Sequence, residues 1–383
     1  MQLIGEALVQ QSFRCWSRLS LGAALTPGLA AIAANARSVN PVSVTDKPDS
    51  VPGVPDHSYV NAVPHWQSLS GSESALNRSG LLGSAGPLCG DVAQHYDRAR
   101  LQLMIDCVCA LSLDAQLNGN QDSRDHAAQM LRSWFINPAT AMIPDGAYAR
   151  LSAVDPSRNV LDAAIDFRDL YPLLDAISLL HRSGAFSLAE SQQLEEWFDS
   201  FLSWLASDSI TFLQQHSTNP ACTWYHLLML AIAAYRGRRN VAAQVFDNLP
   251  GLMARQFRAD GSPQSCPADA RLRHEHLFNL QAWSNLVVLS SALGRDLLGF
   301  TDSNGIGLQT VFSHAEKHLP EGDQQESSPA LHPGNWLQAM KVMTHKSPAR
   351  EMDRLSGLPP LAEASSGLPP FWSLCQAIPA MKG

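Results

Sequence analysis

Charged residues are scarce in this 383-residue chain: Asp, Glu, Lys and Arg make up only 16% of it, and the formal net charge is −8. Nucleic acids and anionic membrane surfaces repel a protein of net negative charge. The chain also lacks an uninterrupted apolar run of about 18 residues, the length that a membrane-spanning helix requires. The sequence therefore predicts no nucleic-acid partner and no membrane span, and it leaves the oligomeric state open.

Common site motifs are missing as well. The sequence contains no G-x-G-x-x-G motif and no P-loop, and none of its seven cysteines belongs to a C-x-x-C pair. Cys107 and Cys109 lie two residues apart on a predicted helix, which turns them toward different faces and not around one zinc ion. We therefore expect neither a cofactor nor a metal.

The N-terminal residues resemble an export signal. Arg14 and Arg18 precede an apolar run over 19–34, and Ala34-Asn35-Ala36 fits a small-x-small cleavage site. Two interpretations stay open: a cleaved signal, which predicts a secreted or periplasmic protein, and an unstructured extension. Residues 37–79 are rich in Pro, Ser, Asp and Asn, and we predict an extended or partly disordered arm.

The rest of the chain has helical spacing of its apolar residues. Ser187 and Glu190 have the spacing of a capping box at the start of one helix, and 142–168 is predicted to contain a long loop. The predicted helices cover 97–117, 125–135, 170–181, 188–207, 223–236, 241–257, 273–293 and 307–318. No run alternates as a strand does, so we predict an all-α fold of antiparallel helical hairpins.

Several segments, taken in order, resemble the family of alginate lyases. The resemblance covers about 56–320 and is carried by S-W-F-I-N-P-A-T-A-M-I-P (133–144), I-D-F-R-D-L-Y-P-L-L-D-A-I-S-L-L (165–180), W-F-D-S-F-L-S-W-L (197–205), T-W-Y (223–225), Q-F-R-A-D-G-S (256–262) and L-F-N-L-Q-A (277–282). It implies an (α/α) toroid or incomplete α/α barrel over 56–320. A possible signal and arm (1–55) would precede this domain, and a loosely ordered tail (321–383) would follow it.

The resemblance implies β-elimination on a uronic-acid polymer such as alginate, so the expected partner is an acidic polysaccharide. Such a lyase must neutralise the substrate carboxylate, remove the C5 proton and protonate the departing O4. The family uses an Asn-His pair before T-W-Y, where this chain has Pro220-Ala221-Cys222. The family's catalytic Tyr falls on Glu275 and an expected Arg falls on Asp269. Framework positions are retained, and most reactive positions are replaced.

Residues near these replaced positions are the candidates for a site. A substitute base is predicted among His274, Glu275 and His276, since imidazole titrates near neutral pH; solvated or capping side chains are the alternative. The predicted substrate-binding residues are Tyr148, Asn219, Trp224, Tyr225, Arg271 and Arg273. Their alternatives are a loop tyrosine, core aromatics and solvated arginines.

Three interpretations of the function follow. The first is a polysaccharide lyase, the second is a catalytically inactive carbohydrate-binding relative, and the third is a chain that folds poorly. Arg168 lies within the retained segment 165–180. There we expect a structural ion pair with Asp166 or Asp169.

Overall fold

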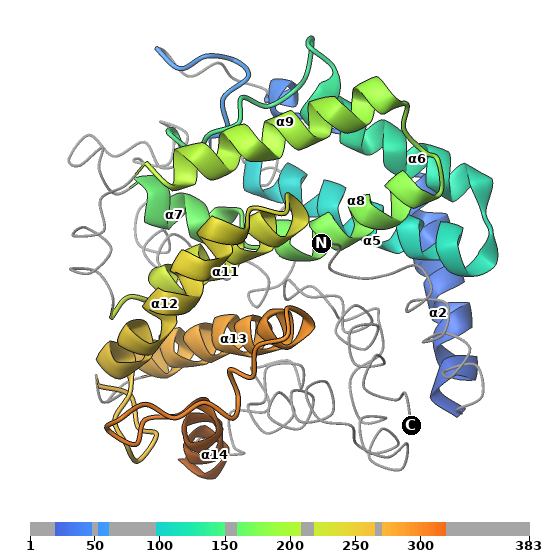
Figure 1. Cartoon of the computed structure of the whole chain (residues 1–383). Coiled ribbons are helices and arrows are strands. Elements are labelled where there is room, and N and C mark those ends of the chain that lie inside the picture. Colours follow the sequence, from blue (N-terminus) through green and yellow to red (C-terminus); the bar gives the residue numbers. More distant parts are fainter. Residues whose placement is uncertain are drawn as a thin grey trace. The chain divides into compact units, whose positions relative to one another are not determined.

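The computed structural model describes residues 20–47, 53–60, 97–149, 159–207, 218–264 and 270–318 (Figure 1). At 20–28, 159, 162 and 270–274 it describes the backbone alone. Apart from two isolated bridges, every regular element in these ranges is a helix, which confirms the all-α prediction. The chain divides into two compact units, one over 27–209 and the other over 1–26 with 210–383, and each is described by itself.

The 27–209 unit is built around α5. Its elements are α2 (Ser20–Arg37, which begins before the unit), η1 (Val44–Asp46), α5 (Asp97–Asn118), α6 (Gln121–Leu131), the π-helix η3 (Arg132–Ile136), α7 (Asn159–Asp166), α8 (Leu170–Arg182) and α9 (Leu188–Leu205). Helix α5 packs against both α6 and α8, while η3 packs against α9. An amphipathic helix is held mainly by such packing and less by its own propensity.

Aromatic side chains form much of the contact between η3 and α9. Phe135 lies edge-on to Trp197 with ring centroids 4.6 Å apart, and Trp197 stacks on Phe201 at 5.2 Å. Phe201 in turn meets Phe167, which precedes α8, at 5.0 Å. Edge-on and offset pairs of this kind add about 0.5–1.5 kcal/mol beyond the area that they bury. Trp134 and Trp197 are thus core residues.

The start of α9 confirms the predicted capping box. The Ser187 side chain accepts from the Glu190 backbone N–H, and the Glu190 carboxylate accepts from the Ser187 N–H at 2.8 Å. The same carboxylate is bound by Arg132, whose Nε lies 2.6 Å from Oε1 and whose Nη2 lies 3.3 Å from Oε2. The helix start of α9 is therefore tied directly to the start of η3.

One prediction in this unit needs correction, and the structure adds detail to two others. Helix α6 begins at Gln121 and not at 125, because the Asn120 side chain caps it by accepting from the Ser123 N–H at 3.2 Å. The stretch 142–168, predicted to contain a long loop, also includes α7, and the described side chains of this helix lie in the core. The described parts of the predicted arm, 37–47 and 53–60, are anchored to the unit, and the Arg37 side chain pairs with Asp114 at 3.0 Å.

The 210–383 unit contains α11 (Pro220–Tyr235), α12 (Arg239–Gln256), α13 (Ala270–Ala292) and α14 (Leu308–His318). Helix α11 packs against both α12 and α13, and it is buried along almost its whole length. It begins three residues before the predicted start, because proline at the first helical position fits the helix without losing a hydrogen bond. The basic residues of the predicted signal and the tail 321–383 lie outside the described residues.

Candidate functional site

Three of the motif segments meet in a closed ring of buried hydrogen bonds. The Thr223 hydroxyl of α11 donates to Asn279 Oδ1 of α13 at 2.7 Å, and Asn279 Nδ2 donates to Gln256 Oε1 at 2.9 Å. Gln256 Nε2 at the end of α12 closes the ring by donating to Thr223 Oγ1 at 3.0 Å. Trp283 Nε1 adds a fourth bond to Gln256 Oε1 at 2.8 Å. The ring therefore fixes the relative positions of α11, α12 and α13.

The ring of hydrogen bonds is buried in an apolar core. Thr223 and Trp283 are fully buried, and Gln256 and Asn279 are nearly so. In such surroundings a polar group without a partner costs about 1–3 kcal/mol, so a ring that satisfies its own members specifies one arrangement of the helices. We refer to Thr223, Gln256, Asn279 and Trp283 as the polar ring. Thr223, Gln256 and Asn279 lie in the segments that resemble the family but had no predicted role, and Trp283 follows the last of these segments.

The polar side chain at the start of α11, that of Asn219, caps the helix. Asn219 is exposed, and its Oδ1 accepts from the Ala221 N–H at 2.9 Å, so it is the N-cap of the helix. This use satisfies one of the free N–H groups at a helix start.

The two aromatic residues that follow are core residues in this unit. Trp224 is 3% exposed and Tyr225 is 5% exposed, and Trp224 packs on Phe278 of α13 with ring centroids 5.0 Å apart. His226 is buried beside them, and its Nδ1 lies 2.6 Å from the Cys222 carbonyl oxygen. Burial lowers the pKa of His226, which keeps its ring neutral at pH 7. The binding role predicted for Trp224 and Tyr225 stays a prediction.

The first turns of α13 carry the predicted base. His274 and His276 both lie within the helix, two residues apart. His276 is buried with its ring 6.2 Å from that of Phe257, and burial, together with the nearby His314, lowers its pKa to about 4. Glu275 is half-buried and more accessible to solvent than His276. The backbone of Arg271, Arg273 and His274 is placed in α13, and their side chains lie outside the described residues.

The D-G-S turn connects α12 to the segment that precedes α13. Phe257 and Pro263 form an isolated bridge across it, and Arg258 spans the turn by donating to the carbonyl oxygens of Pro263 at 3.0 Å and Gln264 at 2.8 Å. Asp260 Oδ1 accepts from the Ser262 N–H at 2.9 Å. The turn is therefore held by its own side chains, and residues 265–269 beyond it lie outside the described part of the chain.

Tyr148 belongs to the 27–209 unit and is described there by itself. It is half-buried in a turn in which the Ala149 N–H donates to the Gly146 carbonyl oxygen at 3.0 Å. An added Cβ at Gly146 would lie 2.6 Å from Ala163 Cβ and 2.8 Å from a ring carbon of Trp204. Close packing at Gly146 thus holds the loop that presents Tyr148.

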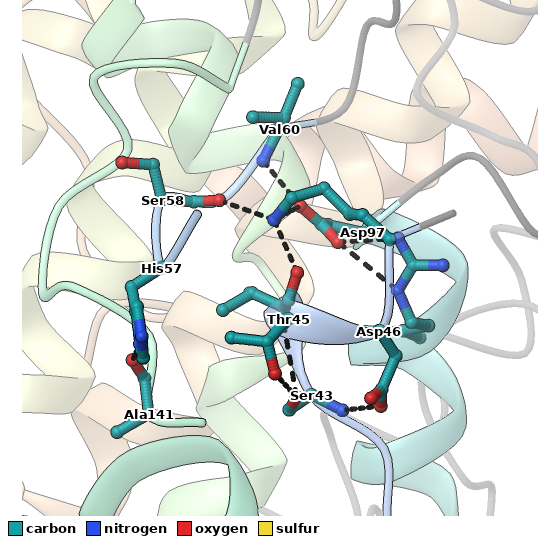
Figure 2. Close-up of polar contacts among 11 residues, drawn as sticks. Ser43, Thr45, Asp46, His57, Ser58, Val60, Asp97 and Ala141 are labelled. Carbon is teal, nitrogen blue, oxygen red and sulfur yellow. Dashed lines mark hydrogen bonds and ion pairs between the residues drawn. The ribbon is translucent and has the colours of Figure 1, made fainter. Parts of the chain in front are cut away.

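Residues 56–60, at the start of the stretch that resembles the family, are anchored in the same unit (Figure 2). Asp97 Oδ2 at the start of α5 accepts from the Val60 N–H at 2.7 Å and pairs with Lys47 Nζ at 3.2 Å. Lys47 Nζ also donates to the Ser58 carbonyl oxygen at 2.9 Å. Burial lowers the pKa of Lys47 and raises that of Asp97, and the attraction between the two charges offsets only part of this effect. We refer to the described residues 44–47 and 53–60 as the strap, and to the Lys47–Asp97 ion pair as the strap anchor.

A second buried ion-pair group confirms the structural role expected for Arg168. Its Nε lies 3.7 Å from Asp169 Oδ2, and the same carboxylate pairs with Arg98 of α5. Burial, together with the charge of Arg98, lowers the pKa of Arg168 to about 10. Tyr59 is fully buried close by against Phe167, with ring centroids 4.5 Å apart. These residues hold α5 against the start of α8.

The comparisons with known proteins agree with this arrangement. The sequence profile of a family described as alginate lyase matches residues 43–324. The structure of an alginate lyase from Bacteroides ovatus is similar, with a TM-score of 0.74 and 18% sequence identity over 93% of this chain and 94% of that chain. At this identity the similarity shows the fold alone, and the fold is the predicted all-α (α/α) toroid. No curated protein matches the chain.

Proposed function

Because the chain belongs to the alginate lyase family, we propose that it is a polysaccharide lyase-like protein that cleaves a uronic-acid polymer such as alginate by β-elimination. The polar ring is the observation that supports this proposal. It ties the first turn of α11, next to the place where the family carries its Asn-His pair, to the end of α12 and the middle of α13 in one buried arrangement. A substrate-binding frame of this kind must be rigid before it can place charge accurately.

Two steps of the reaction, neutralisation of the carboxylate and removal of the C5 proton, have candidate groups in this unit. Arg271 and Arg273 would neutralise the uronate carboxylate, because guanidinium groups bind carboxylates with paired hydrogen bonds. The base that removes the C5 proton would come from His274, Glu275 or His276. His276 is neutral at pH 7 and can accept a proton, but a pKa of about 4 makes it a weak base. Its half-buried neighbour Glu275 is more accessible to a substrate.

The remaining candidates would hold the sugar. The amide of the exposed Asn219 would donate to a substrate oxygen. A hydrogen bond from the half-buried Tyr148, which lies in the 27–209 unit, to a sugar hydroxyl stays a separate prediction. Trp224 and Tyr225 would support the binding surface from the core and not stack on the sugar, because their burial leaves little of either ring exposed. This chemistry requires no cofactor.

The activity is tested by following the absorbance of unsaturated uronate during incubation with alginate and, separately, with polyglucuronate. We expect the absorbance to rise with the full chain. Whichever of the variants Glu275→Ala and His276→Ala abolishes that rise identifies the base. Gln244→Ala, an exposed change on α12, is the matched control and should leave the rate unchanged. A folded protein that gives no rise over a long incubation refutes the lyase proposal.

A second function, carbohydrate binding without turnover, is favoured by the start of α11. The family's Asn-His pair is replaced there by Pro220-Ala221-Cys222, and Asn219 already serves as the helix cap. Calorimetry with alginate oligomers separates the two proposals. Binding with no absorbance change supports the inactive relative, and turnover rejects it.

We also propose that the protein is secreted or periplasmic, where it would meet a uronic-acid polymer. The apolar N-terminal run supports this proposal. Among the helices of the described ranges, none is long and apolar enough to cross a membrane. Cell fractionation followed by N-terminal sequencing of the purified protein tests it, and a protein found only in the cytoplasm with its N-terminus intact rejects it.

A further inference from the structure

The last turn of α14 carries two histidines on one face. His314 and His318 are four residues apart in the stretch H-A-E-K-H, which places their side chains one above the other. Their ring centroids are 4.3 Å apart and their planes are tilted by 39°. His314 is half-buried and His318 is exposed, so the pair is open to solvent on one side.

The position of His314 is fixed by the D-G-S turn. Its ring is hydrogen-bonded to the backbone of Asp260. Gly261 approaches α14 so closely that an added Cβ would lie 2.5 Å from the Thr310 carbonyl oxygen and 2.9 Å from His314 Cβ. A backbone carbonyl that accepts from one ring nitrogen sets the tautomer and leaves the other nitrogen as an acceptor, which is the usual arrangement around a metal-binding histidine.

We propose that His314 and His318 bind a divalent transition-metal ion such as Zn²⁺, with water completing its coordination. Imidazole nitrogens suit ions of this class and not Mg²⁺ or Ca²⁺, which prefer oxygen ligands. Among the residues that the structure describes, no group of three or more His, Cys, Asp or Glu side chains gathers to enclose a metal. The site therefore has two protein ligands and exchanges its metal readily. It is independent of the lyase proposal and was not predicted from the sequence.

A metal at this pair would link two parts of the unit. It would hold the final turn of α14, the part of a helix that frays most readily. Because His314 is bonded to Asp260, it would also steady the contact between α14 and the D-G-S turn. The expected effect is local, and it is greatest in the backbone amides of 308–318.

Hydrogen exchange read by mass spectrometry tests the proposal on the full chain. When Zn²⁺ is present at about ten times its dissociation constant, mass-action linkage predicts that exchange in the α14 peptide slows about tenfold. Mg²⁺ at the same concentration should have no effect. The slowing should vanish in His314→Gln and His318→Gln, and it should persist in His126→Gln, a half-buried histidine of α6.

His318→Cys provides a rescue, because a thiolate is also a zinc ligand and should restore the slowing. This variant keeps the test valid if glutamine itself loosens the last turn. Exchange in 308–318 that does not respond to Zn²⁺, or that slows equally in His318→Gln, overturns the proposal. Zinc bound elsewhere on the chain would not produce this local, variant-dependent pattern.

Discussion

Replacing Gln256 by leucine should destabilise the packing of α11, α12 and α13 by about 3 kcal/mol. In the polar ring, Gln256 Oε1 accepts from Asn279 Nδ2 at 2.9 Å and from Trp283 Nε1 at 2.8 Å. Without that acceptor the two buried donors cost about 1–3 kcal/mol each. Leucine regains about 1 kcal/mol through its additional apolar burial. Thr223 still donates to Asn279 Oδ1, so it adds little to the loss.

The loss of free energy of unfolding is measured by urea unfolding, monitored by helical circular dichroism. Wild type and variant are compared with the same dependence of this free energy on urea concentration. Gln244→Leu is the matched control, because Gln244 lies on the same helix and is exposed. Exposed substitutions of this kind change the free energy of unfolding by about 0.5 kcal/mol or less. A loss below about 1 kcal/mol for Gln256→Leu would show that the ring is not a net contributor, which refutes the reasoning behind it.

Three further predictions concern single side chains. Arg132 and the Ser187 backbone lower the pKa of Glu190 from 4.5 to about 2, so Glu190 stabilises the fold above pH 4.5 and loses this effect as the pH falls toward 2. Glu190→Gln should therefore cost about 1 kcal/mol at neutral pH, after discounting for solvent screening, and nothing at the lowest pH by urea unfolding. Gly261→Ala should cost about 2–4 kcal/mol in the same assay, since its φ is +85° and its Cβ would meet the Thr310 carbonyl. Cys222, whose pKa burial raises to about 12, should resist alkylation until the protein unfolds, as peptide mass spectrometry would show.

Two of these predictions have a matched comparison variant. Gln192→Glu, an exposed change on α9, should not flatten the acid dependence as Glu190→Gln does. Gly184→Ala meets no atom within 4 Å at a φ of +71°, so it isolates the backbone strain from the clash at Gly261. Equal losses for both glycine variants would show that the close approach to α14 contributes nothing. Rapid alkylation of Cys222 in the folded protein would contradict its burial.

Much of the fold was predictable because the local signals agree with one another. Apolar spacing located the helices, and the Ser187 and Glu190 capping box located the start of α9 to the residue. Detail was missed where a signal was short or came from outside the segment. Helix α7 has only eight residues, and it was hidden in a stretch whose composition resembles a loop. The arm was predicted from its composition, which does not reveal that the partner of Lys47 is Asp97, 50 residues away in the sequence.

The candidate site was less predictable, because the framework residues of the family can be retained while its reactive residues are replaced. Gln256 and Asn279 are single polar residues within apolar helices, and such residues form no motif in the sequence. The ring is recognised only when their side chains are seen to meet in space. Burial decided how Trp224 and His276 are placed, and periodicity alone does not distinguish a buried aromatic face from a sugar-stacking one. The sequence therefore located the frame more surely than the chemistry.

The strap anchor sets an order of events during folding. Lys47 reaches Asp97 across 50 residues, whereas helices such as α5 and α6 are formed from neighbours in the chain. Contacts between distant residues are entropically costly to close, so local helices form first and the strap docks late. Until it docks, Asp97 has a carboxylate at the start of α5 without the Lys47 charge. A shortened chain for biochemical work should therefore begin well before Lys47, because trimming past it would leave that buried carboxylate without its lysine partner.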